Sequence, residues 1–447
     1  MSKLITSVAV AASVVFPMAA NATSITYTDA NNLEWHLDVD SSAGTATLGL
    51  GATKKADLTD AKRAIASGTV VGTSAIPWTF TYENVNYTVT KVAAFAFFEL
   101  TTMTGPLTIP DAVTAIGANA FASTGLTRLD GCKGVTSWGN YAFFGCSSMV
   151  GSFPDMTELT SIGEAPFQDC SSLTGPLKLG DSLTSITRLA FANSYFSGTA
   201  VIPESVTTMG YNSNHGVFQN SPNFGAVWVK GKATAASQTY TTVYCAKFAA
   251  SCTALKMILM GQNTKGARMT QTGSSAMLYG DSGVQVFVPD SGYWNGLVLE
   301  GSNNNAWYYG PTNDFNLVVD DDAMRATFTP TTADALTNAL AWVPQFKTHF
   351  NLDAHVSVTN AIDLTGVTIT EDMVSGVTFD RLMFSAKTQT QLDAILGKFP
   401  VTTPISIDPT GLTENMVVPD TYTNVYVKTV PGVTIRRTAR GFMIVVR

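Results

Sequence analysis

The sequence predicts an α+β chain that is mostly β, with a solenoid of stacked repeats between an N-terminal β cap and a duplicated α/β C-terminal region. The main observation is a four-residue phrase, Val/Leu-Thr-x followed by a large apolar residue, which recurs every 22 to 24 residues. Such a period indicates a solenoid, because one short repeat cannot bury its apolar side alone and stacks on its neighbours. Charged residues make up only 13% of the chain, which favours stacked strands over a helical bundle.

A phenylalanine follows each phrase and marks the expected core of each repeat. In the first five copies it lies five residues after the last residue of the phrase, and the residue before it is mostly alanine. The phrases begin at Val89, Val113, Val135, Leu159, Leu183 and Val206, and the phenylalanines are Phe97, Phe121, Phe143, Phe167, Phe191 and Phe218.

The N-terminus is typical of an export signal. Lys3 gives a positive start, residues 4–20 are an apolar run, and Ala20 and Ala22 are the small residues that a signal peptidase reads. A transmembrane anchor is the alternative, but the short run and its small-residue exit favour cleavage after Ala22. No second apolar stretch of 18 residues follows, so we expect a secreted or cell-surface protein without a transmembrane segment in the mature chain.

Residues 23–88 are expected to form an N-terminal β cap. Residues 35–39 alternate large and polar side chains, a turn follows at 40–44, and residues 45–48 return, which is typical of a hairpin. A brief helix-like insertion is expected at 57–66. Such a cap covers the open edge and bare core that the first coil would otherwise expose.

The solenoid is assigned to residues 89–290, and each coil there has a second expected strand. Its pattern is Gly-x-Leu-x-Ile-Pro, seen most clearly at 105–110 and in related form at 175–180 and 198–203. The alternation directs the Leu and Ile positions inward, and the trailing proline ends the strand. Degraded copies continue to a last strand at 284–289.

At Leu159–Gly175 these elements occur together, as Leu-Thr-Ser-Ile-Gly followed by Phe-Gln-Asp-Cys-Ser-Ser-Leu-Thr-Gly. This block resembles the BspA-type leucine-rich repeat, and the resemblance covers about residues 75–290. It implies a leucine-rich-repeat solenoid, secreted or surface-displayed, that binds host, matrix or neighbouring-cell partners, and it implies no catalytic residues. Trp138, Pro166 and the insertion at 211–216 depart from the pattern.

Five cysteines are too few and too scattered for a disulfide framework. Cys146 and Cys170 each follow a repeat phenylalanine by three residues, so they occupy equivalent sites on adjacent coils. Coils about 4.8 Å apart would fall inside the Cα window for a disulfide, but parallel side chains give poor bridge geometry. Buried thiols are therefore the expectation, with a disulfide as the alternative.

Residues 291–330 are expected to be a linker or end cap, and residues 331–447 contain their own duplication. Asp363-Leu-Thr-Gly-Val-Thr matches Asp408-Pro-Thr-Gly-Leu-Thr, and helical patterns at 333–346 and 389–399 precede the two copies. We interpret these as two helix-plus-strands units, whose strands could extend the solenoid sheet. The last residues, 441–446, should form a buried or paired strand.

The residues offer little chemistry, so no enzyme activity, cofactor or metal site is expected. The four histidines are not spaced as metal ligands, and the acidic run at 320–322 and the turn at 38–42 are interpreted as solvated turns before calcium sites. No nucleophile elbow, phosphate loop or zinc-protease motif occurs. Carboxylates that pair only in space would be invisible, so a glycoside-active site stays open. The net charge of −7 argues against nucleic-acid partners.

The predicted binding face is the column of outward residues on the second strand of each coil. Exposed aromatic and apolar side chains mark binding sites, and the second half of this column is apolar. The alternative, which we favour, is that the C-terminal unit packs over it. The face comprises Arg128, Lys178, Val201, Trp228, Ile258 and Phe287.

The function predicted from the sequence is an exported, non-catalytic surface protein that mediates adhesion or protein recognition through a repeat face. Its partner would be a protein or glycan on another cell or in the matrix. A polysaccharide-binding or polysaccharide-active protein working through the C-terminal region is the alternative, and a structural envelope protein is a third class. The sequence does not identify the ligand, the mode of anchoring or the oligomeric state.

Overall fold

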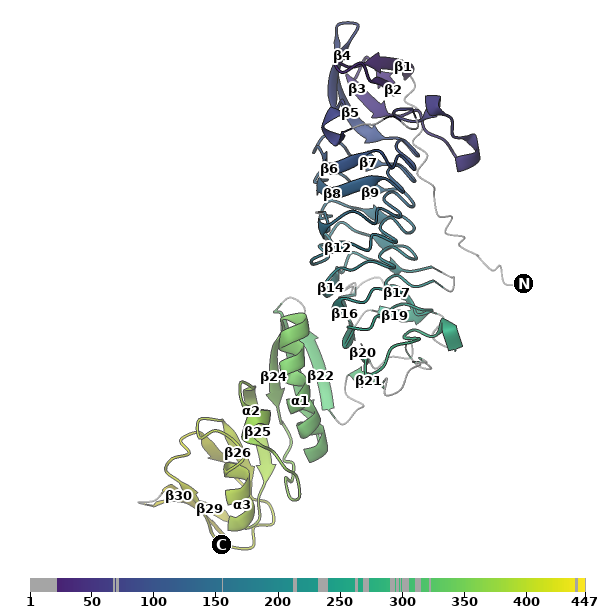
Figure 1. The fold of residues 1–447 in the computed structure, drawn as a ribbon. Helices are drawn as coiled ribbons and strands as arrows, with labels where there is room; N and C mark the ends of the chain where they lie inside the picture. The colour runs from purple at the N-terminus through teal and green to yellow at the C-terminus, as the bar shows by residue number, and fades with distance from the viewer. Residues whose placement is uncertain are drawn as a thin grey trace, which may run out of the picture. The chain divides into compact units, whose positions relative to one another are not determined.

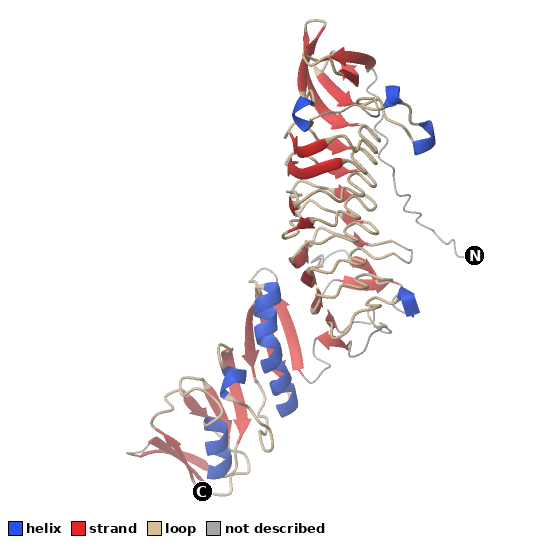
Figure 2. Cartoon of the chain, viewed as in Figure 1, coloured by secondary structure: helices blue, strands red, loops and turns tan. Residues whose placement is uncertain are grey.

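The computed structural model describes residues 22–446 except 67–68, 70–71, 155, 212–214, 232–239, 262–263, 268–272, 290–293, 295–296, 298, 300–304, 310–314, 321–322 and 439–440. The signal segment, parts of the expected 291–330 linker or end cap and most of the 320–322 acidic run therefore lie outside the described residues. The chain divides into two compact units, residues 1–286 with 291–306, and residues 287–290 with 307–447. Strands dominate, and the three α-helices lie within residues 333–396 (Figure 2).

One continuous sheet runs through the cap and along one side of the coils (Figure 1). The expected cap hairpin is present, since Leu37 pairs with Leu48 in antiparallel register. The insertion expected at 57–66 contains one 3₁₀ turn, Asp60–Lys62, and a second, Lys55–Asp57, ends at its first residue. The strands of this sheet are β1 (Thr23–Thr28), β2 (Glu34–Asp40), β3 (Thr45–Leu48), β4 (Thr79–Tyr82), β5 (Val85–Val92), β7 (Ala115–Ile116), β9 (Ser137–Trp138), β11 (Ser161–Ile162), β13 (Ser185–Ile186), β15 (Thr208–Met209), β17 (Thr241–Tyr244) and β19 (Thr264–Ala267).

The second strands of the coils pair with one another on the other side of the solenoid. They form the parallel pairs β6–β8 and β10–β12 and most of the five-stranded sheet β14–β16–β18–β20–β21, in which β14, β16 and β18 are parallel. The strands are β6 (Thr104–Ile109), β8 (Gly125–Gly131), β10 (Gly151–Ser152), β12 (Leu173–Thr174), β14 (Gly198–Ile202), β16 (Phe224–Val229), β18 (Met257–Met260), β20 (Gln285–Pro289) and β21 (Asn305–Tyr309). The predicted solenoid of stacked coils is confirmed.

The threonine of the recurring phrase holds the coils in register. The backbone N–H of Thr160 donates to the carbonyl of Thr136 at 2.9 Å, and the hydroxyl of Thr160 reaches the same oxygen at 3.0 Å. Each threonine of this ladder bonds to the one a coil earlier, from Thr90 through Thr114, Thr136, Thr160, Thr184 and Thr207. Because the hydroxyl bonds inside the ladder, Thr suits a strand of only two residues, where the backbone alone has few partners.

The phenylalanines stack along the core as the repeat predicts. The ring centroids of Phe121 and Phe143 lie 5.2 Å apart and those of Phe143 and Phe167 lie 5.7 Å apart, with the rings nearly parallel. Glycine after the phrase allows this spacing: a Cβ on Gly139 would lie 2.4 Å from the backbone nitrogen of Ala118 in the previous coil. The coils therefore approach more closely there than any side chain permits.

A second buried column lies three residues after the phenylalanine position. The Cys146 thiol donates to the carbonyl of Phe121 at 3.1 Å, and the Cys170 thiol donates to that of Phe143 at 3.2 Å. Ser194, Ser221 and Cys252 make the same bond to the Phe carbonyl one coil earlier. All five cysteines of the chain are free and buried, so the expected thiol stack is confirmed and no Cys146–Cys170 bridge forms.

Asp281 occupies the same position in the next coil, three residues after Leu278. The backbone N–H of Asp281 donates a hydrogen bond to the carbonyl of Leu278. It is only 5% exposed, and burial raises the pKa of its carboxyl to about 6 from an ordinary 3.8, although the N–H groups of Cys252 and Ser251 oppose the shift.

This raised pKa predicts a pH-dependent stability. Between pH 4 and 6 the folded chain holds a proton that the unfolded chain releases, so Asp281 lowers stability by roughly 3 kcal/mol in all as pH rises through this window. Urea unfolding of the native chain and of Asp281→Asn between pH 4 and 7 measures the effect. The variant should gain stability relative to the native chain as pH rises, whereas a pH-independent difference would contradict the assignment.

The second unit contains a mostly parallel sheet and three helices. The sheet has the order β22 (Phe315–Asp320), β23 (Arg325–Pro330), β24 (Asp353–Ser357), β25 (Thr378–Ser385), β26 (Ile405–Asp408) and β28 (Val425–Val427), with only β22 antiparallel. The helices are α1 (Ala333–Phe350), α2 (Glu371–Val374) and α3 (Gln389–Leu396). The suggestion that these strands extend the solenoid sheet is wrong, because they pair with one another.

The duplication is visible in matching hydrogen bonds. Oδ1 of Asp363 accepts from the N–H and hydroxyl of Thr365, and Oδ1 of Asp408 accepts in the same way from Thr410. The preceding helices also match, since the hydroxyls of Thr332 and Thr388 accept from the N–H three residues later and cap α1 and α3. The C-terminal strand β30 (Gly441–Val446) is paired on both sides, between β27 (Met416–Pro419) and β29 (Val433–Thr438), as predicted.

Candidate functional site

The first coils carry a groove of about 550 Å³ on the side of β6 and β8. Ser123 and Gly145 form its corners with positive φ angles of 57° and 70°, which turn the chain sharply after each phenylalanine and open the space. Every lining residue is a threonine, a serine or a glycine: Thr101, Thr104, Ser123, Thr124, Gly125, Thr127, Gly145, Ser147 and Ser148. The groove is therefore uncharged and rich in hydrogen-bonding hydroxyls.

The polar half of the predicted binding column lies on the surface. Arg128 and Lys178 are exposed, and Arg128 forms an ion pair with Asp130 at 2.6 Å. Val201 is half-buried and lies directly beside Trp228 in the parallel register of β14 and β16. These three residues come from different coils of the same side of the solenoid.

The apolar half of the column is buried, so the prediction of an exposed binding face at these residues is wrong. Trp228 is 1% exposed, and Ile258 and Phe287 are fully buried. Ile258 also has another neighbour than expected, because the register pairs it with Val227 and places Leu259 beside Trp228. Phe287 belongs to the second unit, where its ring lies 5.3 Å from that of Trp342 and 5.1 Å from that of Phe346. Burial on both faces of β16 and β18 explains why alternation could not reveal a surface there.

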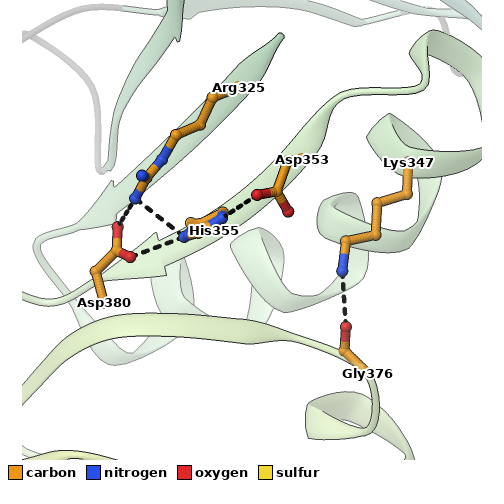
Figure 3. A network of polar contacts seen from close by, with 6 residues as sticks. All are labelled: Arg325, Lys347, Asp353, His355, Gly376 and Asp380. Carbon is orange, nitrogen blue, oxygen red and sulfur yellow. Dashed lines mark hydrogen bonds and ion pairs between the residues drawn. The ribbon is translucent and has the colours of Figure 1, made fainter. Parts of the chain in front are cut away.

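A polar network on three strands of the second unit surrounds His355 (Figure 3). Nδ1 of His355 lies 2.7 Å from Oδ1 of Asp380, and Nε2 lies 2.7 Å from Oδ2 of Asp353. Carboxylate oxygens only accept hydrogen bonds, so a ring nitrogen that carries hydrogen donates to the carboxylate it faces. Arg325 donates to Oδ2 of Asp380 at 2.5 Å, and the same guanidinium nitrogen lies 3.0 Å from Nδ1 of His355.

A break in the ladder brings Asp380 to this network. Val356 pairs with Phe379 and Ser357 pairs with Arg381, so Asp380 is the extra residue of a bulge in β25. Bulges re-aim side chains, and this one directs the carboxylate toward Arg325 and His355. The hydrogen bond from His355 is the main reason why the pKa of Asp353 lies below its usual range.

Removing the shared carboxylate should weaken the second unit. Asp380→Asn replaces two charge-assisted contacts, and we expect a loss of about 1–3 kcal/mol in its free energy of unfolding. Asp353→Asn is the matched control, because the Asp353 side chain is 64% exposed and should contribute well under 1 kcal/mol. Thermal unfolding of the three proteins tests this, and equal losses in both variants would contradict the network as drawn.

The network links the side chains of three neighbouring strands by hydrogen bonds and ion pairs. No group of three His, Cys, Asp or Glu residues that could hold a metal occurs within the described part of the chain. No serine, threonine or cysteine hydrogen-bonds to His355 among the described residues, so the geometry provides no activated nucleophile. Sequence reasoning considered His355 only as a metal ligand, and it missed Arg325 and Asp380, because a bulge leaves no signal in the alternation.

Comparison with protein families agrees with this geometry. Residues 90–224 match the BspA type leucine rich repeat region in six copies. Residues 90–224 are BspA-type leucine-rich repeats. The matched residues contain the threonine ladder and most of the phenylalanine stack, so these contacts are the structural form of the repeat. No helix of the described residues is long and apolar enough to cross a membrane.

Three solved structures align with the leucine-rich-repeat chain. A leucine rich cell surface protein from Faecalibacterium prausnitzii aligns over 65% of this chain and 96% of its own, with 18% identity and a TM-score of 0.35. A leucine-rich repeat protein from Bacteroides ovatus covers 64% and 98%, with 13% identity and a TM-score of 0.24. The pneumococcal vaccine antigen PcpA covers 93% and 98%, with 13% identity and a TM-score of 0.29. No curated protein sequence matches the chain significantly.

Proposed function

We propose that this leucine-rich-repeat chain is an exported surface protein that recognises a protein partner, and so mediates adhesion, through the hydroxyl-rich groove of its first coils. The observation that carries this proposal is the groove itself, which crosses three successive coils and exposes hydroxyls without charge. Its walls belong to a rigid ladder, so little order has to be gained on binding.

The surrounding surface supports protein recognition over catalysis. Arg128 and Lys178 lie exposed on the same side and provide charged positions beside a neutral centre. An arrangement of hydrogen-bonding groups with charges at its margin is common in protein interfaces. The candidate catalytic types near the groove, Ser and Thr, have no histidine or carboxylate in hydrogen-bond contact among the described residues, and Thr124 donates instead to the carbonyl of Phe121.

Site-specific photo-crosslinking tests this proposal on the full mature chain. A photoreactive residue at Ser148, in the groove, is compared with one at Thr184, on the exposed threonine ladder of the opposite sheet. Incubation with immobilised purified matrix proteins should give crosslinks from position 148 and few from position 184. Binding that crosslinks equally from both positions, or only from 184, would overturn the groove as the recognition surface.

A further inference from the structure

Charge is strongly segregated along the solenoid. Residues 205–280 contain Lys230, Lys232, Lys247, Lys256, Lys265 and Arg268 and not one aspartate or glutamate. With 33 acidic residues in 447, a stretch of this length would be expected to contain about six. The last coils are therefore positive in a chain whose net charge is −7.

The lysines of this stretch that the structure describes are available for a ligand. Lys230, Lys247, Lys256 and Lys265 form no ion pair with any described residue. Lys230 lies over the ring of Trp228 at 5.0 Å and Lys265 over that of Tyr240 at 5.9 Å, so these two ammonium groups contact aromatic faces, not carboxylates. Unneutralised cations raise the local concentration of anions around these coils.

Two of these lysines lie in one coil, and an exposed tyrosine lies in the coil that follows it. Lys247 is a corner of its coil, with a φ of 50°, and Lys256 directly precedes β18. Segment 275–279 of the next coil runs alongside, since Lys247 N–H donates to Ser275 and Ser251 N–H donates to the carbonyl of Tyr279 at 2.9 Å. Tyr279 is 45% exposed, and its backbone segment lies beside residues 247–251 of the preceding coil.

We infer that the edge formed by Lys247, Lys256 and Tyr279 binds an acidic polysaccharide, with the lysines on its carboxylate, sulfate or phosphate groups and the tyrosine ring on a sugar. The exposed ring supplies the apolar face that a pyranose covers, and the lysines supply point charges for anions along the polymer. Asp281, the nearest acid in sequence, is 5% exposed and leaves this edge positive.

The same charges favour a glycan over a nucleic acid. Residues 23–204 contain 16 acidic and 9 basic residues, so a long duplex that extends beyond the last coils would meet a negative surface. A flexible polysaccharide needs only the short positive edge. This surface lies in later coils than the hydroxyl-rich groove, so the inference goes beyond the proposed protein recognition and is tested independently of it.

Binding of the full mature chain to heparin, lipoteichoic acid and neutral dextran at 50 mM salt tests the inference. We expect binding to a polyanion and not to dextran, with affinity that falls linearly with the logarithm of salt concentration. The first two probes distinguish a sulfated matrix glycan from a phosphate polymer of a cell wall. Equal binding to dextran, or binding to neither polyanion, would overturn the site.

Variants locate the site. Lys247→Gln with Lys256→Gln should lower affinity for the preferred polyanion at least about tenfold, and Tyr279→Ala should weaken binding without changing its salt dependence. The matched control is Lys133→Gln with Lys178→Gln, which removes the same charge from exposed positions of the first coils. Equal losses in the two double variants, or duplex DNA bound more tightly than both glycans, would refute the assignment. Circular dichroism confirms that each variant is folded.

Discussion

Truncation of Phe143 to alanine is expected to destabilise the solenoid by about 3–5 kcal/mol. Phe143 is fully buried and stacks on Phe121 and Phe167, and its ring also lies 5.4 Å from that of Trp138. The cavity would interrupt the stack in the middle of the ladder. Because each coil contacts only its neighbours, no distant contact can compensate.

Equilibrium unfolding in urea measures this loss, and Phe144→Ala is the matched control. Phe144 is the next residue, of the same type, but it is only partly buried, against the cluster of Phe95, Phe98 and Ala122. Its truncation should cost about 1 kcal/mol. Comparable losses in the two variants would show that the rings do not form the core of the repeat.

Replacing Trp228 by aspartate is expected to cost several kcal/mol as well, because it places a carboxylate where a fully buried ring lies. Trp228 is 1% exposed in β16, between Val201 of β14 and Leu259 of β18. The substitution distinguishes a core position from the exposed binding residue that the alternation predicts. If Trp228 is a core residue, the substitution should lower the free energy of unfolding of the isolated protein.

Lys178→Asp is the control for this experiment. Lys178 is the residue of the predicted column in an earlier coil, and it is exposed. Its substitution should change the free energy of unfolding by no more than about 0.5 kcal/mol. If Trp228→Asp changed the free energy of unfolding equally little, Trp228 would be a surface residue and the predicted binding face would be supported.

The solenoid could be predicted from the sequence because its contacts repeat. Each threonine of the ladder, such as Thr160, bonds to the equivalent threonine one coil away, and each stacked ring, such as Phe143, contacts the equivalent ring. The spacing of the repeats therefore predicts both contacts. The duplication of residues 331–447 was visible for the same reason, as Asp363 and Asp408 accept identical hydrogen bonds. Contacts that repeat in the structure require residues that repeat in the sequence.

The candidate sites were less predictable, because they depend on contacts that do not repeat. The groove arises from small residues at one corner of each coil, and each of these residues alone resembles any turn. Asp380 contacts His355 only because a bulge re-aims its side chain. Trp228 is buried, although the alternation of side chains along its strand predicts that it points outward. The acid-free stretch from 205 to 280 is plain in the sequence, but only the fold brings Lys247 and Tyr279 to one edge.

Counting free thiols tests most directly the central claim that one buried position of each coil bonds to the Phe carbonyl of the coil before it. All five cysteines are buried and free, and Cys146, Cys170 and Cys252 donate to those carbonyls. Burial raises the pKa of all three thiols, so they should also be unreactive in the folded chain. Titration without reductant should therefore give five thiols in the denatured protein and almost none in the native one. Three thiols after denaturation, or fast reaction of the folded chain, would contradict the stacked column.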